Sequence, residues 1–123
     1  MNLKGFTEQE CQGLLDLAVL AMYADGHLAL VEDARVQRLL TAMGCDSDYD
    51  RDKHYDAAVS RVSRHSQTVE VARAHAATLA QVFTTREHRR QAYDVLSDLA
   101  ASDNQVAPQE GSYLAVVRQA FQM

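Results

Sequence analysis

One segment of this chain occurs twice, 78 residues apart, and each copy lies between two stretches of apolar residues at helical spacing. The copies are ADGHLALVE at 24–32 and SDNQVAPQE at 102–110. An Asp, a residue that tolerates left-handed backbone, an apolar residue and a Glu recur in the same order and spacing. The repeat predicts two equivalent helix-turn-helix corners, with an approximate internal two-fold that relates the first two helices to the last two.

The remaining sequence favours helices throughout. It has no Ile, no Trp and a single Pro, it is rich in helix formers, and it lacks the alternation of a half-buried strand. We expect an all-α domain of about six helices around a central, apolar first helix. The expected helices cover 7–24, 30–43, 49–63, a stretch that begins at 66 or 68, 84–101, and 108 to the end of the chain.

Local signals mark several of these helix ends. Thr7 and Glu10 have the spacing of a capping box, in which each side chain accepts a hydrogen bond from the other residue's amide. Thr84 and Glu87 predict a second capping box for the fifth helix. Gly44 is placed to end the second helix in the left-handed region.

Size and charge narrow the function classes. A chain of 123 residues predicts one domain over 1–123, and its net charge of -5 argues against nucleic acid or an anionic membrane as a partner. The longest apolar run, 17–24, is too short to cross a bilayer, and the first residues do not resemble a signal peptide. Cys11 and Cys45 do not form a disulfide framework. We therefore expect a cytoplasmic protein with no membrane insertion and reduced thiols.

The carboxylates of the two corners allow two interpretations. In the first, they only stabilise turns, and Glu32 and Glu110 cap the helices that follow. In the second, the two-fold brings Asp25, Glu32, Asp103 and Glu110 together around a calcium or magnesium ion, because clustered carboxylates need a hard cation to neutralise them. Asp16, Asp94 or Asp98 could then supply a further ligand.

The corner sequences resemble the tellurite-resistance protein B (TerB-like) domain family. The resemblance rests on the Asp-Gly-x-Leu-x-x-x-Glu pattern at 25–32 and its echo at 103–110, and it extends loosely over most of the chain through length and helix order. It implies a compact all-helical cytoplasmic domain associated with tellurite and other chemical stress, with a metal held by acidic helix corners. In this chain Ala29 and Ala107 replace the Ser or Thr that family members often carry at the helix cap.

No other pattern points to catalysis. The alternating Asp residues of 46–52 imitate the opening of an EF-hand loop but lack its Gly and closing Glu, and the five His residues form no ligand pair on one helix. The sequence thus predicts a non-enzymatic, stress-response interaction module with protein partners and a divalent cation. A metal-dependent enzyme that uses the same carboxylates, and a purely structural helical adaptor, are the alternatives.

Overall fold

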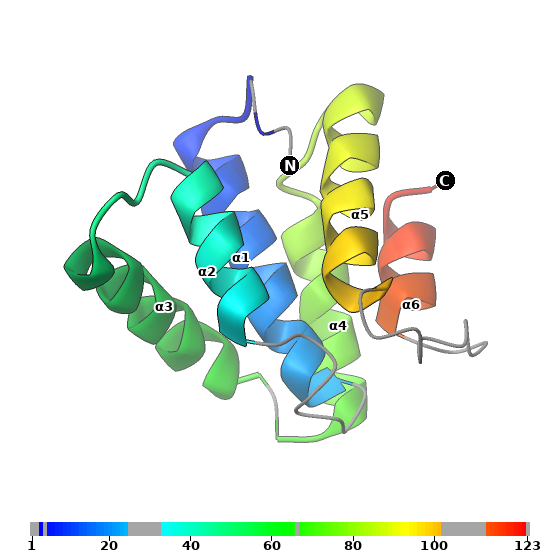
Figure 1. Ribbon diagram of the computed structural model, residues 1–123. Helices are drawn as coiled ribbons and strands as arrows, with labels where there is room; N and C mark the ends of the chain where they lie inside the picture. The colour runs from blue at the N-terminus through cyan, green and yellow to red at the C-terminus, as the bar shows by residue number, and fades with distance from the viewer. Residues whose placement is uncertain (1–2, 4, 25–32, 66, 102–112, 123) are drawn as a thin grey trace.

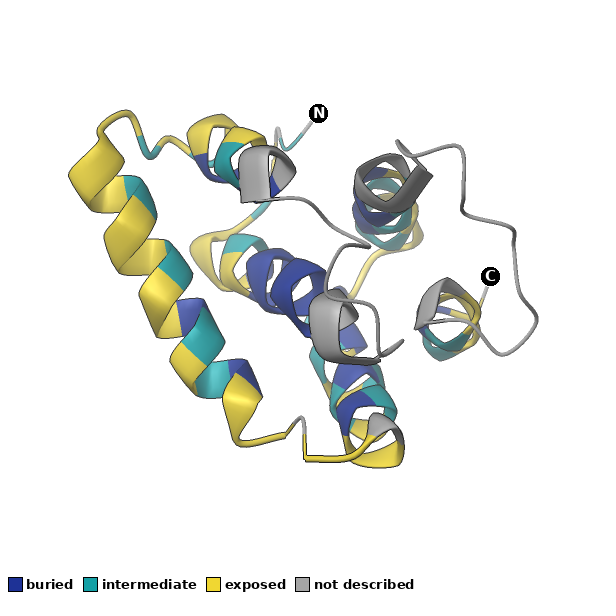
Figure 2. Cartoon of the chain, turned by 60° about the horizontal axis from the view of Figure 1, so that its bottom comes forward, coloured by how far each residue is buried: buried dark blue, intermediate teal, exposed yellow. Residues whose placement is uncertain are grey.

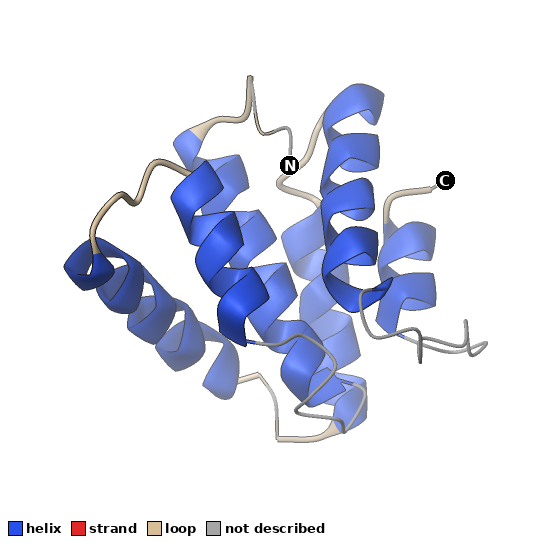
Figure 3. Ribbon diagram, in the orientation of Figure 1, coloured by secondary structure: helices blue, strands red, loops and turns tan. Residues whose placement is uncertain are grey.

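A computed structural model describes residues 3, 5–24, 33–65, 67–101 and 113–122, and the part of the chain that it describes contains helices and no strands (Figure 3). The helices are α1 (Glu8–Ala24), α2 (Asp33–Ala42), α3 (Asp48–Ser63), α4 (Val69–Ala80), α5 (Arg86–Ala101) and α6 (Tyr113–Ala120). The expectation of an all-α bundle of about six helices is confirmed.

Helix α1 is the centre of the bundle. It packs mainly against α3 and α4 and also contacts α2 and α5, while α6 packs against α4 and α5 (Figure 1). All residues from Gly13 to Leu20 are buried, because this half of α1 is apolar on every side (Figure 2). Each fully buried Leu or Val contributes about 1.5–3 kcal/mol to the stability of the fold. The buried apolar side chains form one cluster to which all six helices contribute.

Helix α3 lies at the edge of the bundle. It packs against α1 and α2, and Figure 2 shows most of its outward side exposed to solvent. Its stripe of Ala58 and Val62 faces the core, as the helical spacing of these residues predicts. Over the described residues, no helix is long and apolar enough to cross a membrane.

Four helices begin with a hydroxyl side chain that accepts a hydrogen bond from the third helical residue. The caps are Thr7, Ser47, Thr68 and Thr85, each with an oxygen-to-nitrogen distance of 3.1 Å. The reciprocal bond of the Thr7 capping box is also present, because the Thr7 amide donates to Glu10 Oε1 at 3.0 Å.

The expected capping box at Thr84 is wrong by one residue. Thr85, not Thr84, precedes α5, so the third helical position holds His88 and Glu87 is exposed. Two neighbouring Thr residues offer the same cap chemistry, and the sequence pattern alone chose the wrong one.

The helix ends of the two predicted repeats occur at equivalent positions. Helices α1 and α5 begin 78 residues apart, and so do the ends of α2 and α6. Positive φ angles at Gly44 (98°) and Gln122 (60°) follow those ends at the same separation. The agreement supports the repeat, which stays a prediction because the two corners, 25–32 and 102–112, lie outside the described residues. One pair does not match, since Asp16 is buried whereas Asp94 is exposed.

Candidate functional site

All four predicted cation ligands, Asp25, Glu32, Asp103 and Glu110, lie outside the described residues. The helices that border them are described. The C-terminal ends of α1 and α5 and the N-terminal ends of α2 and α6 lie at the same end of the bundle in Figure 1, and the rotated view in Figure 2 agrees. Within the described ranges, no group of three or more His, Cys, Asp or Glu side chains could hold a metal ion.

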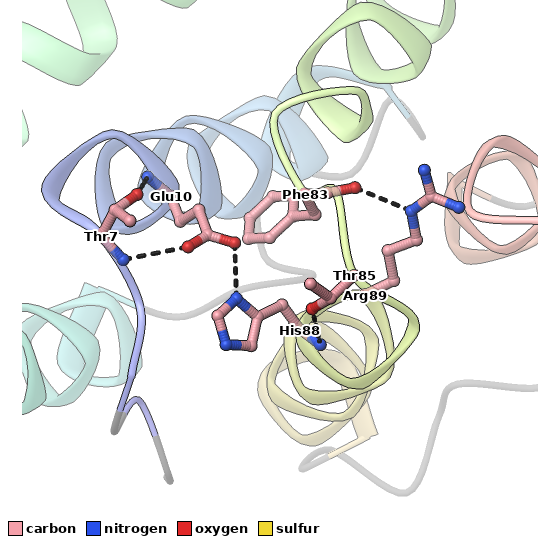
Figure 4. Close-up of polar contacts among 6 residues, drawn as sticks. All are labelled: Thr7, Glu10, Phe83, Thr85, His88 and Arg89. Carbon is pink, nitrogen blue, oxygen red and sulfur yellow. Dashed lines mark hydrogen bonds and ion pairs between the residues drawn. The ribbon is translucent and has the colours of Figure 1, made fainter.

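At the opposite end of α1 and α5, a buried carboxylate joins the two helices. His88 Nδ1 lies 2.7 Å from Glu10 Oε2, and the side chains are only 21% and 6% exposed (Figure 4). Because an ionised carboxylate can only accept hydrogen bonds, His88 Nδ1 carries the hydrogen. The other oxygen of Glu10 accepts from the Thr7 amide, so one carboxylate caps α1 and binds α5 at the same time. We call this Glu10–His88 contact the clamp.

The N-terminal segment covers the clamp. The Phe6 ring lies against the His88 ring with centroids 5.0 Å apart, and it meets the Phe83 ring edge-on at 5.7 Å. Gly5 adopts φ +90, and a Cβ atom added there would lie 3.6 Å from His88 Nε2. The left-handed Gly5 thus lets the chain pass close to the imidazole. The result is an apolar cover that shields the charge-assisted hydrogen bond from water.

The protonation of Glu10 reflects these contacts. Burial opposes ionisation, but the Thr7 amide and the His88 ring stabilise the carboxylate and together hold the pKa of Glu10 below its usual value. The carboxylate is therefore ionised at neutral pH, and the clamp combines a hydrogen bond with charge attraction when His88 is protonated.

The sequence analysis did not find the clamp. Glu10 was assigned only to the capping box, and His88 belonged to no ligand pattern. One signal was available: Glu10 and His88 are separated by 78 residues, the same separation as the repeated corners. They occupy the third position of α1 and of α5, so the clamp joins equivalent positions of the two predicted repeats.

A second polar cluster joins α1, α3 and α4. Arg61 donates to both carboxylate oxygens of Asp16, with nitrogen-to-oxygen distances of 2.8–3.2 Å. Asp16 is buried and committed to this pair, so the suggestion that it ligates a cation at the corners is wrong. Nearby, the His65 and His75 rings stack with centroids 3.9 Å apart and an interplanar angle of 15°. Burial lowers the pKa of His75, the charge of His65 lowers it further, and Asp16 acts in the opposite direction.

The acidic stretch 46–52 behaves as the start of a helix. Ser47 caps α3, Asp48 and Asp50 lie in its first turn, and Asp48 forms an ion pair with Arg51. Negative charge at this position interacts favourably with the helix dipole. The arrangement agrees with the helix-start interpretation of these residues.

Cys11 and Cys45 are free thiols, as expected. Burial raises the pKa of each thiol, and neighbouring carboxylates raise it further. A thiol with a raised pKa is a poor nucleophile at neutral pH, so neither environment favours cysteine chemistry.

Comparison with protein-family models, with curated proteins and with solved structures finds no match for this chain. The assignment of a function therefore depends on the residues and their arrangement.

Proposed function

We propose that this chain is a non-enzymatic, cytoplasmic interaction module of the TerB-like kind. Its two acidic corners together bind one divalent cation, calcium or magnesium, and the module serves a chemical stress response through a protein partner. The ligands are Asp25, Glu32, Asp103 and Glu110. The observation that carries the proposal is that the four helix ends bordering the two corner segments lie at one end of the bundle (Figures 1 and 2).

The clamp gives a physical reason for this arrangement. It joins the first turns of α1 and α5, which have 17 and 16 residues and are therefore each about 25 Å long. The two helices run in the same general direction in Figure 1. Two helices of nearly equal length that are joined at their N-terminal turns bring their C-terminal ends to the same end of the molecule. Each acidic corner begins immediately after one of those ends.

A cation has an electrostatic role at such an end. Four carboxylates repel one another, and the chain already carries a net charge of -5. Calcium prefers six to eight oxygen ligands, and magnesium is commonly held by one or two carboxylates and several waters. Binding would offset the repulsion and tie the two halves of the bundle together at the end opposite the clamp.

Calorimetric titration of the full chain with calcium, magnesium, manganese and zinc tests the proposal. We expect heat of binding with calcium or magnesium, together with a rise in melting temperature, because an ion that binds only the folded state stabilises it. The double variant Asp25→Asn with Asp103→Asn should lose both effects.

The matched control is Asp56→Asn with Glu70→Gln. It removes the same amount of negative charge from exposed positions on α3 and α4, so it should bind as the unaltered chain does. The absence of heat with every ion would refute the cation site and leave the structural-adaptor interpretation. Binding that survives Asp25→Asn with Asp103→Asn would move the site elsewhere.

A further inference from the structure

The stacked imidazoles of His65 and His75 connect two helices that otherwise pack on different neighbours. His65 follows the C-terminal end of α3, which packs against α1 and α2, whereas His75 lies within α4. The rings are nearly parallel, at 15°, and their centroids are 3.9 Å apart. His65 is exposed and His75 is half-buried, so protons from solvent can reach this contact.

Such a stack is favourable only while at least one ring is neutral. A single imidazolium can lie against the face of a neutral ring, as in a cation–π contact, but two imidazolium ions at this separation repel each other. The unshifted pKa of histidine is 6.5, so the balance changes in mildly acidic solution.

The charged groups around the stack determine how far a second proton is tolerated. Asp16 on α1 is the carboxylate whose charge acts on His75, but both of its oxygens are already bound by Arg61 on α3. On α4, Arg73 and Glu70 flank His75 in sequence, and Glu70 is exposed. On α6, which packs against α4, the charged side chain among the described residues is Arg118, and it is exposed.

We propose that the His65–His75 stack is a proton-operated latch. It holds the C-terminal end of α3 against α4 at neutral pH and releases it when both rings become charged in mildly acidic solution. The Asp16–Arg61 ion pair stays intact over this range, so α3 remains attached to α1 while its C-terminal end separates from α4. The latch does not depend on the cation site.

Nuclear magnetic resonance of the full chain between pH 8 and pH 5 tests the latch. Ring-proton signals report the titration of each histidine, and through-space cross-peaks between the His65 and His75 rings report the closed state. We expect the cross-peaks at pH 7.5 and their loss by pH 5. In His65→Phe, which keeps an aromatic ring but cannot be protonated, His75 should titrate at a higher pH than in the unaltered chain.

His54→Phe is the matched control, because it removes an exposed histidine from the same helix. The titration midpoint of His75 should be unchanged in this variant. Cross-peaks that persist after both rings have titrated would overturn the proposal. It would also be overturned if His75 titrated at the same pH with and without His65. Because His65 is exposed, both variants should fold, and His75→Phe provides the reciprocal test on His65.

Discussion

The clamp between Glu10 and His88 should contribute more to stability than any other polar contact between α1 and α5 that the structure describes. Replacing Glu10 by Ala removes the side-chain acceptor of the Thr7 amide and the partner of His88 Nδ1. Loss of one capping interaction costs about 1 kcal/mol, and loss of a buried charge-assisted hydrogen bond costs about 1.5–3 kcal/mol. We therefore expect Glu10→Ala to lower the free energy of unfolding by about 2–4 kcal/mol.

A double-mutant cycle isolates the contact itself. Glu10→Ala, His88→Ala and the double variant are compared by urea denaturation at pH 7 and low salt. His88 is one-fifth exposed, so solvent weakens the pair, and we expect a coupling energy of about 1.5 kcal/mol, at the lower end of the range for hydrogen bonds to charged groups. For 123 residues, 1 kcal/mol corresponds to about 4 °C in melting temperature.

Thr85→Ala is the control variant, because it removes the cap of α5 and leaves the Glu10 carboxylate untouched. It should cost about 1 kcal/mol and should show no coupling to Glu10→Ala. A coupling energy between Glu10 and His88 below about 0.5 kcal/mol, the level of additivity error, would refute the reasoning.

Acid provides a second measurement of the same contact. The pKa of Glu10 is lower in the folded state than in the unfolded chain, so its stabilisation is complete above the ordinary value of 4.5 and is lost as the pH falls through the folded-state value. Stability plotted against pH should therefore fall less steeply below pH 4.5 in Glu10→Ala than in the unaltered chain. Parallel curves would contradict the assignment.

Three further substitutions test other features. Arg61→Met should destabilise by about 3 kcal/mol in chemical denaturation, because it leaves the Asp16 carboxylate buried without its guanidinium; a loss below about 1 kcal/mol would contradict this. Gly44→Ala should lower the melting temperature by about 4–8 °C, because Gly44 has φ +98 and the left-handed conformation costs about 1–2 kcal/mol with a Cβ; an unchanged melting temperature would argue against that cap. His88→Glu should be less stable than His88→Gln at pH 7, and the difference should shrink at pH 5, because two carboxylates at the position of the Glu10 contact can then share a proton.

Features specified by neighbouring residues were predictable from the sequence. The Thr7–Glu10 capping box, the left-handed Gly44 and the apolar half of α1 each depend on residues within one or two helical turns. These signals fix where helices begin and end, and the apolar half of α1 identifies the helix at the centre. The error at Thr84 has the same origin, since a local signal with two adjacent solutions cannot choose between them.

The long-range polar contacts were not predictable in this way. Asp16 and Arg61 are 45 residues apart, and Glu10 and His88 are 78 residues apart. Helical periodicity identifies the face of a helix that is buried, but it does not identify the polar residue that meets another on a neighbouring helix. The cation site is a different case, because its four ligands lie outside the described residues and the site stays a prediction.

The clamp also shows why a repeat can be hard to recognise at the place where its halves meet. Under the predicted internal two-fold, the third residue of α1 and the third residue of α5 are equivalent, and these are the residues in contact. Identical residues at such a position would place two carboxylates or two imidazoles against each other, and each pair repels when charged. A Glu opposite a His turns that repulsion into attraction. Divergence at this position is therefore what physics requires of a duplicated helix that packs on its own copy, whereas each Thr cap contacts only its own helix and can stay the same.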